Sequence, residues 1–240
     1  MDAPLLDDTT RDRLTRISTA SLTTALFKRG LRSQVIQGAL PVVRKPGNMV
    51  GQAFTLRTIP AREDRNPISV FRRENHPQRV AVERCPPRFV MVIDSRKDAR
   101  AASAGAILVS RLQVRGCAGI VTDGGFRDAE AIGALDMPAF HVRPSAPTNL
   151  TLHEAIEFDV PVACGDVLVG DGDGVVVIPI GLAREVAAEC AEMESFETFV
   201  AQSVREGWPV IGLYPPTREE TVQRYERWRE SQAKGKGPAG

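Results

Sequence analysis

The chain has 240 residues, of which 25% are charged and 42% hydrophobic, and its formal net charge is +1. This balance is that of a globular protein, and a charge so near zero argues against a nucleic-acid partner. No stretch reaches the roughly twenty apolar residues that cross a membrane, so we expect no membrane attachment.

The N-terminus and the cysteines indicate a cytoplasmic protein. A signal peptide needs a cationic start and an apolar core, but acidic residues stand here instead, so we expect no signal peptide. The four cysteines are scattered and form no CxxC pair. This spacing argues against a zinc site and favours reduced thiols.

Helices are predicted between residues 8 and 30. Side chains that can accept a hydrogen bond from the first turn of a helix stand at two places: Asp8, Thr9 and Thr10, then Ser18 and Thr19. Gly30 can end the second helix. An alternating strand is expected over residues 53–59. From Pro60 to about Pro77 arginines mix with acids, which predicts a long solvated loop.

Residues 88–143 alternate between strand and helix patterns. A strand is predicted from Phe89 to Ile93, a helix from about residue 105 to 115, and further strands in "AGIVTD" and "PAFHVR". The helix "DAEAIGAL" lies between the last two. This order is typical of a parallel βαβαβ segment, so we expect an α/β fold with a mixed sheet.

The C-terminal third has a different character. "GDVLVGDGDGVVVIP" predicts short antiparallel strands, and "LAREVAAECAEMESFETFVAQSVREG" predicts a long amphipathic helix with Val186, Cys190, Met193 and Phe196 or Phe199 on one side. An extended piece, a short helix and a disordered tail follow. We expect one α/β domain over residues 1–200 and an extension over residues 201–240 that packs on the domain or on a neighbouring subunit.

Two junctions between a strand and a helix lie close together in the sequence. Gly105 opens one helix, whose first N–H groups, from Gly105 to Leu108, suit a carboxylate or phosphate. The turn Gly124-Gly125 leads to Arg127, a bidentate anion donor, and to Asp128, a hard oxygen ligand for Mg²⁺ or Mn²⁺. The alternative is that Arg127 forms a surface salt bridge and Asp128 caps the next helix.

The same stretch carries a family resemblance. "GIVTDGGFRD", preceded by "GAILVSRLQVRG" and followed by "PAF", resembles the GxxGxVxDGxxRD signature of the RraA-like family, which holds class II 4-hydroxy-4-methyl-2-oxoglutarate aldolases and regulators of RNase E. The resemblance extends to "STASLTTALFKRG", "GQAFTLR" and "GDVLVGDGDGVVVIP", over most of residues 15–195. It implies an α/β fold related to the swivelling β/β/α domains, assembled as homotrimers or hexamers.

The resemblance also implies site residues. Asp128 matches the metal-binding aspartate, Arg127 matches the substrate-binding arginine, and Gly105, Ala106, Ile107 and Leu108 match the substrate-binding loop. The aldolases carry an acid at the second loop position, where this chain has Ala106. The run before the Gly-Asp turn also looks shorter than in the family.

The implied reaction is cleavage of a 2-oxo acid to pyruvate, with Arg127 and Asp123 as catalytic candidates. Aldol cleavage needs a base for the 4-hydroxyl proton, whereas decarboxylation of an oxaloacetate-like acid does not. We therefore expect Ala106 to impair aldol cleavage more. Five residues are candidates for a replacement base: Asp123, Glu63, Asp64, His141 and His153. Asp123 could instead orient its turn, His141 could be a packed structural residue, and His153 could belong to a capped helix or loop.

Three other functions compete with the lyase. The first is a non-catalytic protein that binds a ribonuclease. The second is a methyltransferase, which the sequence disfavours because it has no glycine-rich turn after a first strand for an adenosyl cofactor. The third is a lyase or dehydratase of sugar-acid breakdown that uses the same metal site.

Overall fold

The computed structural model describes residues 5–160 and 165–235. Its internal contacts divide the chain into two compact units, Met1–Ala188 and Glu189–Gly240. Helix α6 (Ala183–Arg205) contributes residues to both units. It also runs through residue 200, so a domain boundary at that residue stays a prediction.

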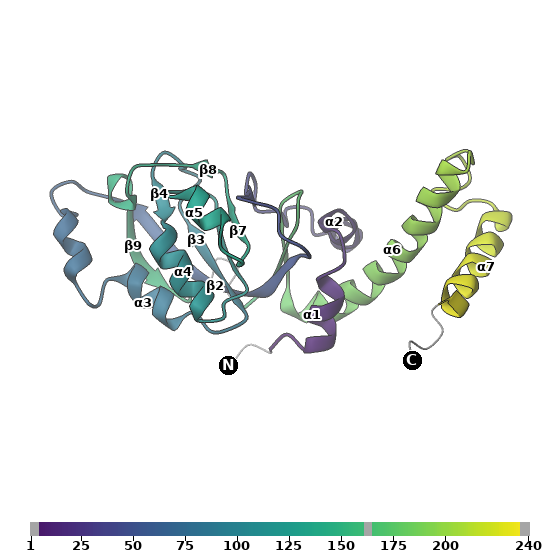
Figure 1. Ribbon diagram of the computed structural model, residues 1–240, viewed down its shortest axis with the longest axis horizontal. Helices are drawn as coiled ribbons and strands as arrows, with labels where there is room; N and C mark the ends of the chain where they lie inside the picture. Colours follow the sequence, from purple (N-terminus) through teal and green to yellow (C-terminus); the bar gives the residue numbers. More distant parts are fainter. Residues whose placement is uncertain (1–4, 161–164, 236–240) are drawn as a thin grey trace. The chain divides into compact units, whose positions relative to one another are not determined.

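The first unit contains a mixed sheet (Figure 1). In spatial order its strands are β1 (Leu40–Pro41), β7 (Ala139–His141), β5 (Gly119–Thr122), β3 (Phe89–Asp94), β2 (Met49–Pro60), β10 (Val167–Gly170) and β11 (Val175–Ile178), with β9 (His153–Phe158) also paired to β2. The pairs β2–β3, β3–β5 and β5–β7 are parallel, which confirms the βαβαβ segment. Strands β10 and β11 are antiparallel, as predicted.

A second, small sheet consists of β4 (Ala102–Ala104), β6 (Gly125–Phe126) and β8 (Arg143–Pro144), all parallel. The sequence does not predict these strands, because segments of two or three residues have no measurable periodicity and are rich here in alanine and glycine. Strand β4 follows β3 in the chain, β6 follows β5, and β8 follows β7. Each strand of the small sheet therefore comes directly after a parallel strand of the main sheet, and β4 and β6 precede helices α4 and α5.

Both faces of the main sheet are buried. Figure 1 shows α3 (Pro77–Arg84), α4 (Ala106–Val114) and α5 (Ala129–Gly133) over one face. There Met91 and Ile120 of the strands pack with Leu112 of α4. On the other face Val90 and Leu168 belong to a second core cluster. Neighbouring residues of a strand point to opposite faces, so Val90 and Met91 serve different cores.

The N-terminal helices are α1 (Asp8–Leu14) and α2 (Thr19–Lys28). The expectation that Asp8, Thr9 or Thr10 caps the first helix is wrong, because Asp7 occupies that position and accepts a hydrogen bond from the Thr10 N–H. Ser18 caps α2 by accepting from the Ser21 N–H. Gly30 follows α2 with φ +81°, a left-handed conformation that favours glycine.

Two regions differ from the sequence-based expectation. The predicted loop before Pro77 contains a 3₁₀ helix, Ile68–Arg72, and leads into α3, which the sequence does not predict because "PQRVAVER" is mostly polar. The expectation of a helix or loop at His153 is also wrong. A 3₁₀ turn, Asn149–Thr151, ends just before it, and His153 begins strand β9.

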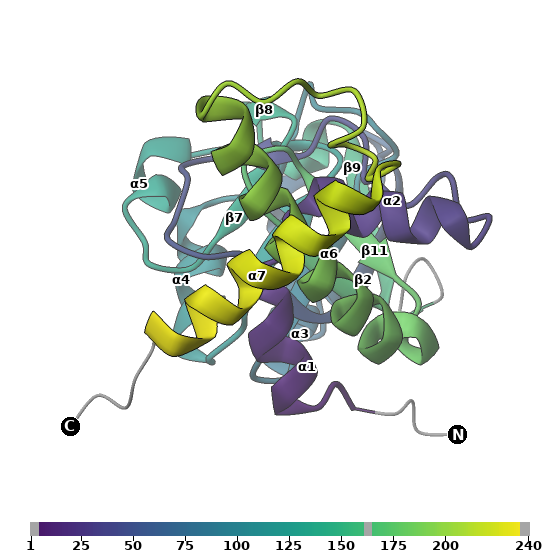
Figure 2. The same ribbon diagram turned by 90° about the vertical axis from the view of Figure 1, so that its right-hand side faces the viewer.

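The second unit contains α6 from Glu189 onward and the whole of α7 (Glu219–Gly235), which turns back beside α6 (Figure 2). Phe196 and Phe199 of α6 contact Tyr225 of α7, with ring centroids 5.1 and 5.6 Å apart. Of the predicted apolar side of α6, Val186, Cys190 and Phe199 are buried.

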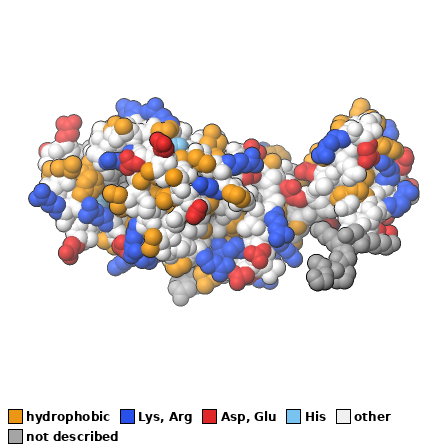
Figure 3. All heavy atoms as spheres, in the orientation of Figure 1, with side chains coloured by type: hydrophobic (Ala, Val, Ile, Leu, Met, Phe, Trp, Pro, Cys, Tyr) orange, Lys and Arg blue, Asp and Glu red, His pale blue; other side chains and the backbone are white. Residues whose placement is uncertain are grey.

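The charges on the surface are mixed. Figure 3 shows Lys and Arg side chains interspersed with Asp and Glu side chains on the visible face. Among the described residues, no helix combines the length and the apolar character that a membrane span requires.

Asp171, in the turn between β10 and β11, connects that turn to α2. Its carboxylate accepts hydrogen bonds from the N–H and hydroxyl of Thr19, both at 2.8 Å. We expect Asp171→Ala to lower the free energy of unfolding by about 2 kcal/mol in urea titrations, because two charge-assisted bonds at a helix start are lost. Asp173→Ala in the same turn is the control, since its side chain is exposed. An equal effect of both variants would contradict this role of Asp171.

Candidate functional site

The pairing of β4 with β6 brings the two predicted junctions together. Ala102 pairs with Gly125 and Ala104 with Phe126, and the Arg127 N–H donates to the Ala104 carbonyl at 3.1 Å. Both strands lead directly into helices. Gly105 and the pair Arg127–Asp128 are therefore neighbours at one end of the small sheet, where ligands commonly bind in parallel α/β folds.

Both glycines of the Gly124-Gly125 turn are required by close packing. A Cβ atom on Gly124 would lie 2.6 Å from the Ser103 hydroxyl oxygen, and one on Gly125 would lie 2.7 Å from the Ser145 Cβ. Ser103 belongs to a buried hydroxyl cluster, with oxygens 2.6 Å from Ser95 and 2.7 Å from Thr122. This cluster joins the ends of β3 and β5 to β4 beneath the site.

Gly105 allows the Arg127 and Asp128 side chains to approach the start of α4. A Cβ atom at this position would lie 2.9 Å from the Arg127 Cγ and 3.1 Å from an Asp128 carboxylate oxygen. The φ of Gly105 is −129°, which any residue can adopt. Space, not backbone conformation, is therefore the reason for glycine here.

Asp128 has an unusual backbone conformation. Its φ of 56° and ψ of 38° are left-handed, and its side chain makes no capping hydrogen bond to α5. Arg127 Nε lies 3.4 Å from the Asp128 carboxylate, and both side chains are about half exposed. The arginine thus pairs with its own neighbour, and the alternative in which Asp128 caps the helix by its side chain is not observed.

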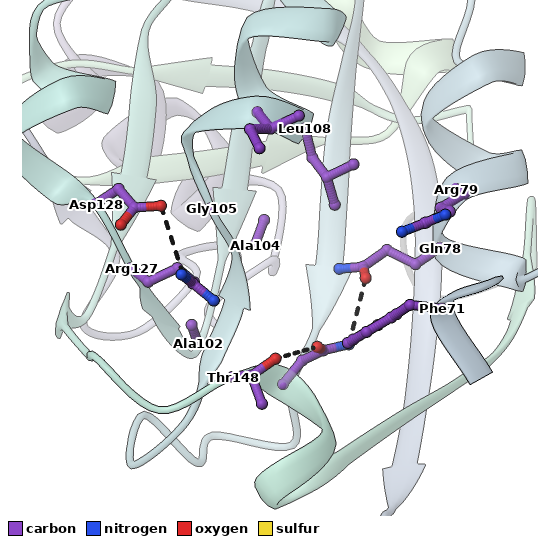
Figure 4. Close-up of a pocket in the computed structure, with 12 residues that line it drawn as sticks. Phe71, Gln78, Arg79, Ala102, Ala104, Gly105, Leu108, Arg127, Asp128 and Thr148 are labelled. Atoms are coloured by element: carbon purple, nitrogen blue, oxygen red, sulfur yellow. Dashed lines mark hydrogen bonds and ion pairs between the residues drawn. The ribbon is translucent and has the colours of Figure 1, made fainter. Parts of the chain in front are cut away.

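Arg127, Asp128 and Gly105 line a cavity of about 230 Å³ (Figure 4). Its remaining walls are of three kinds: apolar (Phe71, Ala102, Ala104, Ile107, Leu108), neutral polar (Gln78, Thr148, Asn149) and cationic (Arg79). Asp128 is the one acid in this lining within the described residues. The cavity therefore combines two guanidinium groups with a single carboxylate.

The first turn of α4 begins with Ala106, which packs against the apolar core and does not line the cavity, and continues with Ile107, which does line it. In the described part of the chain, the N–H groups of Ala106 and Ile107 have no acceptor, as is usual at a helix start. The N–H of Leu108 donates to the Gly105 carbonyl at 3.1 Å, so the expectation that it is free is wrong. Leu108 still lines the cavity.

Asp123 lies outside this cavity. Its two carboxylate oxygens accept hydrogen bonds from the N–H groups of Ser95 at 2.6 Å and of Lys97 at 2.8 Å. It lines a different hollow, together with Asp94. The structure thus gives Asp123 the orienting role that was the alternative to catalysis, and it does not bring Asp123 to Arg127.

None of the other candidate bases lines the cavity. His141 is buried and stacks on Phe126, with ring centroids 5.4 Å apart, and burial lowers its pKa. His153 is fully buried, and its Nε2 lies 3.0 Å from the Asp98 carbonyl oxygen. Glu63 and Asp64 are exposed on the segment after β2. In the described residues, the cavity therefore contains no histidine and no second acid.

Some lining residues were not predicted. Gln78 and Arg79 come from α3, and Thr148 and Asn149 precede or begin a 3₁₀ turn. They stand outside the recognised motifs, and the helix that carries Arg79 is not apparent from the sequence. In the sequence, the one feature that points to Arg79 is the group of arginines in the segment that begins at Pro60.

The lining offers a candidate protein ligand for a hard divalent cation, the Asp128 carboxylate. No group of three His, Cys, Asp or Glu side chains that could hold a metal occurs among the described residues. Mg²⁺ keeps several waters and often uses one or two protein carboxylates, so the half-exposed Asp128 can serve as its protein ligand. A closed zinc site needs more nitrogen or sulfur ligands than this cavity has.

Comparison with known proteins places the chain in a family. The model of the RraA-like family, described as Aldolase/RraA, matches residues 19–177, and the chain belongs to this family. A Halalkalibacterium halodurans protein named "Putative 4-hydroxy-4-methyl-2-oxoglutarate aldolase" is 30% identical over 145 residues, which are 56% of this chain and 67% of that protein.

Solved structures share the fold. Streptomyces coelicolor RraAS2, called an unusual member of the RNase ES inhibitor RraA family, is 27% identical with a TM-score of 0.69, and the match covers 82% of this chain and 97% of that one. An uncharacterised Pseudomonas syringae protein has a TM-score of 0.72 at 22% identity, over 86% and 97% of the two chains. At 22% identity, the match to the Pseudomonas syringae protein shows a shared fold and nothing about function.

The buried histidines give a pH dependence of stability. Burial lowers the pKa of His153 below its usual 6.5, so below that pH the unfolded chain binds more protons than the folded one. We expect the free energy of unfolding to fall as the pH drops from about 6.5 to the lowered folded pKa, by up to about 1.4 kcal/mol per pH unit for this group. Urea titrations between pH 7.5 and 5 measure the slope. His153→Gln should reduce the slope without abolishing it, because burial also lowers the pKa of His76 and His141. An unchanged slope would show that His153 is not responsible.

Proposed function

We propose that this protein is a divalent-metal-dependent lyase that cleaves 2-oxo acids and releases pyruvate. The observation that carries the proposal is the meeting of Arg127, Asp128 and Ile107, whose N–H has no acceptor at the start of α4, in one cavity. The family match and the relative named as an aldolase support it. Arg127 and the Ile107 N–H can bind an anionic oxygen of the ligand. Asp128 can bind a cation that in turn binds such an oxygen.

The chain's own groups account for binding and charge stabilisation. The Arg127 guanidinium binds the 2-oxo acid's carboxylate in a bidentate manner once its weak contact with Asp128 is exchanged for the ligand. The N–H of Ile107 points its positive end at negative charge that develops on the enolate. Asp128 would hold Mg²⁺ or Mn²⁺, which supplies a Lewis acid for the 2-oxo group. Leu108 gives one wall of the cavity an apolar surface beside the bound ligand.

The lining favours decarboxylation over aldol cleavage. In the described residues the cavity has no general base besides Asp128, which is assigned to the metal. Breaking the C3–C4 bond of an oxaloacetate-like acid releases CO₂ and leaves the electron pair on the enolate. No hydroxyl proton must be removed. Aldol cleavage requires that removal, which a general base typically accelerates by about 10²- to 10⁴-fold.

The central experiment measures pyruvate release from oxaloacetate with Mg²⁺ or Mn²⁺. We expect activity that a chelator removes, and a loss of at least roughly 100-fold in kcat/KM for Asp128→Asn, because a Lewis acid contributes several kcal/mol. Asp136→Asn, at an exposed acid outside the cavity, is the control and should retain activity. Metal-independent turnover, or full activity of Asp128→Asn, would overturn the proposal.

Position 106 tests the choice of reaction. We expect Ala106→Asp to raise aldol cleavage of a 4-hydroxy-2-oxo acid by up to about 100-fold relative to oxaloacetate decarboxylation, because it supplies the missing acid–base group. Ala106→Asn has the same size without a titratable proton and should leave the ratio unchanged. The ratio of the two kcat/KM values is the readout. An equal rise with Asn would mean that proton transfer is not the cause.

A second function, ribonuclease binding without catalysis, is favoured by the similarity to RraAS2. In that case the surface of the protein, and not the cavity, carries the activity. Inhibition of an RNase E-type enzyme that persists in Asp128→Ala and in the presence of chelator would support it. Inhibition that is absent from the unmodified chain would exclude it. We also expect assembly as a homotrimer or hexamer, which light scattering measures.

A further inference from the structure

Arg79 is a second cation in the cavity, and the proposed function does not use it. It comes from α3, whereas Arg127 follows β6. Figure 4 shows the two side chains on opposite sides of the cavity, each with its guanidinium end directed inward. Two guanidinium groups that face one hollow from different elements suit a ligand with an anionic group at each end.

The charge of Arg79 is not compensated by the protein. Within the described residues it has no ion-pair partner, and its guanidinium carbon lies 5.7 Å from the centre of the Phe71 ring. Arg127, by contrast, already has Asp128 beside it. The cavity thus has one excess positive charge, and a bound divalent cation would raise that excess to three. A dianionic ligand balances this charge better than a monoanionic one.

Hydrogen bonds hold the start of α3 against the rest of the site. The buried Gln78 donates from Nε2 to the Ser103 carbonyl of β4 at 2.6 Å. Asn149 donates to the Gln78 amide oxygen at 3.3 Å and accepts from the Thr148 hydroxyl at 3.1 Å. Strand β4 runs on to Gly105, so this chain of bonds sets the position of α3, and of Arg79, relative to the start of α4.

We propose that Arg79 is a specificity-determining residue that binds the terminal carboxylate of a 2-oxo acid of five or more carbons, a carboxylate that is not lost as CO₂ from C4, while Arg127 binds the near end. The inference rests on the proposed function for the near end. It goes further in assigning a residue that selects dicarboxylic over monocarboxylic 2-oxo acids. Phe71 positions the guanidinium through its ring face.

The test compares two unreactive ligands of equal carbon number, 2-oxoglutarate and 2-oxopentanoate, which differ in a terminal carboxylate or methyl group. Isothermal titration in the presence of Mg²⁺ gives both affinities. We expect the unmodified protein to prefer 2-oxoglutarate by roughly 10- to 100-fold. Arg79→Met should reduce this ratio to about one while leaving 2-oxopentanoate binding intact.

Two further variants separate charge from structure. Arg79→Lys keeps the charge and should retain a preference of several-fold. Arg72→Met removes an exposed arginine of the neighbouring 3₁₀ helix that does not line the cavity, and should keep the full preference. The inference is overturned if Arg79→Met preserves the ratio, if it weakens both ligands equally, or if the unmodified protein binds neither ligand.

The affinity test of Arg79 can be interpreted whether or not the protein is a lyase. If the unmodified protein binds both ligands but releases no pyruvate from any 2-oxo acid, the proposed lyase function fails, and the ratio of affinities still tests Arg79. If pyruvate is released but Arg79→Met keeps the preference for 2-oxoglutarate, the lyase function stands and the role of Arg79 fails.

Discussion

The parallel pairing of β4 with β6 is the constraint on which the site depends. It continues past the end of β6 through the bond from the Arg127 N–H to the carbonyl of Ala104, the last residue of β4. That bond places Arg127 and Asp128 against Gly105 at the start of α4. This register is what brings the start of α4 and Arg127 to the same cavity.

Small residues make this pairing possible. The ends of β3, β4 and β5 meet at the hydroxyls of Ser95, Ser103 and Thr122, and Gly124 passes close beside them. A buried hydroxyl must have a hydrogen-bond partner, and here the three satisfy one another in a compact arrangement. The main sheet therefore supports the small sheet through polar contacts as well as apolar packing, which limits how far the site can shift.

The parallel core could be predicted from sequence, because Phe89–Ile93 and residues 119–122 are continuous apolar runs separated by a helix with a glycine after it. The roles of Arg127 and Asp128 came from residue chemistry together with the family motif. The small sheet could not be predicted, because its strands owe their existence to tertiary pairing. The same holds for Arg79, which reaches the cavity only because α3 is held by Gln78. Asp123, a motif acid, accepts hydrogen bonds from the N–H groups of Ser95 and Lys97 and does not line the cavity, a placement that the motif did not predict.

The left-handed backbone conformation of Asp128 limits which residue types can replace it while keeping the geometry of the site. For most residue types this backbone region is unfavourable, and asparagine, aspartate and glycine tolerate it best. Of these three, only aspartate has a negative charge. Glutamate, the usual conservative exchange, has the charge but neither the backbone tolerance nor the short reach. A relative with another residue at this place would lack the carboxylate that we propose as the cation ligand, so the residue found there indicates whether the proposed chemistry is available to it.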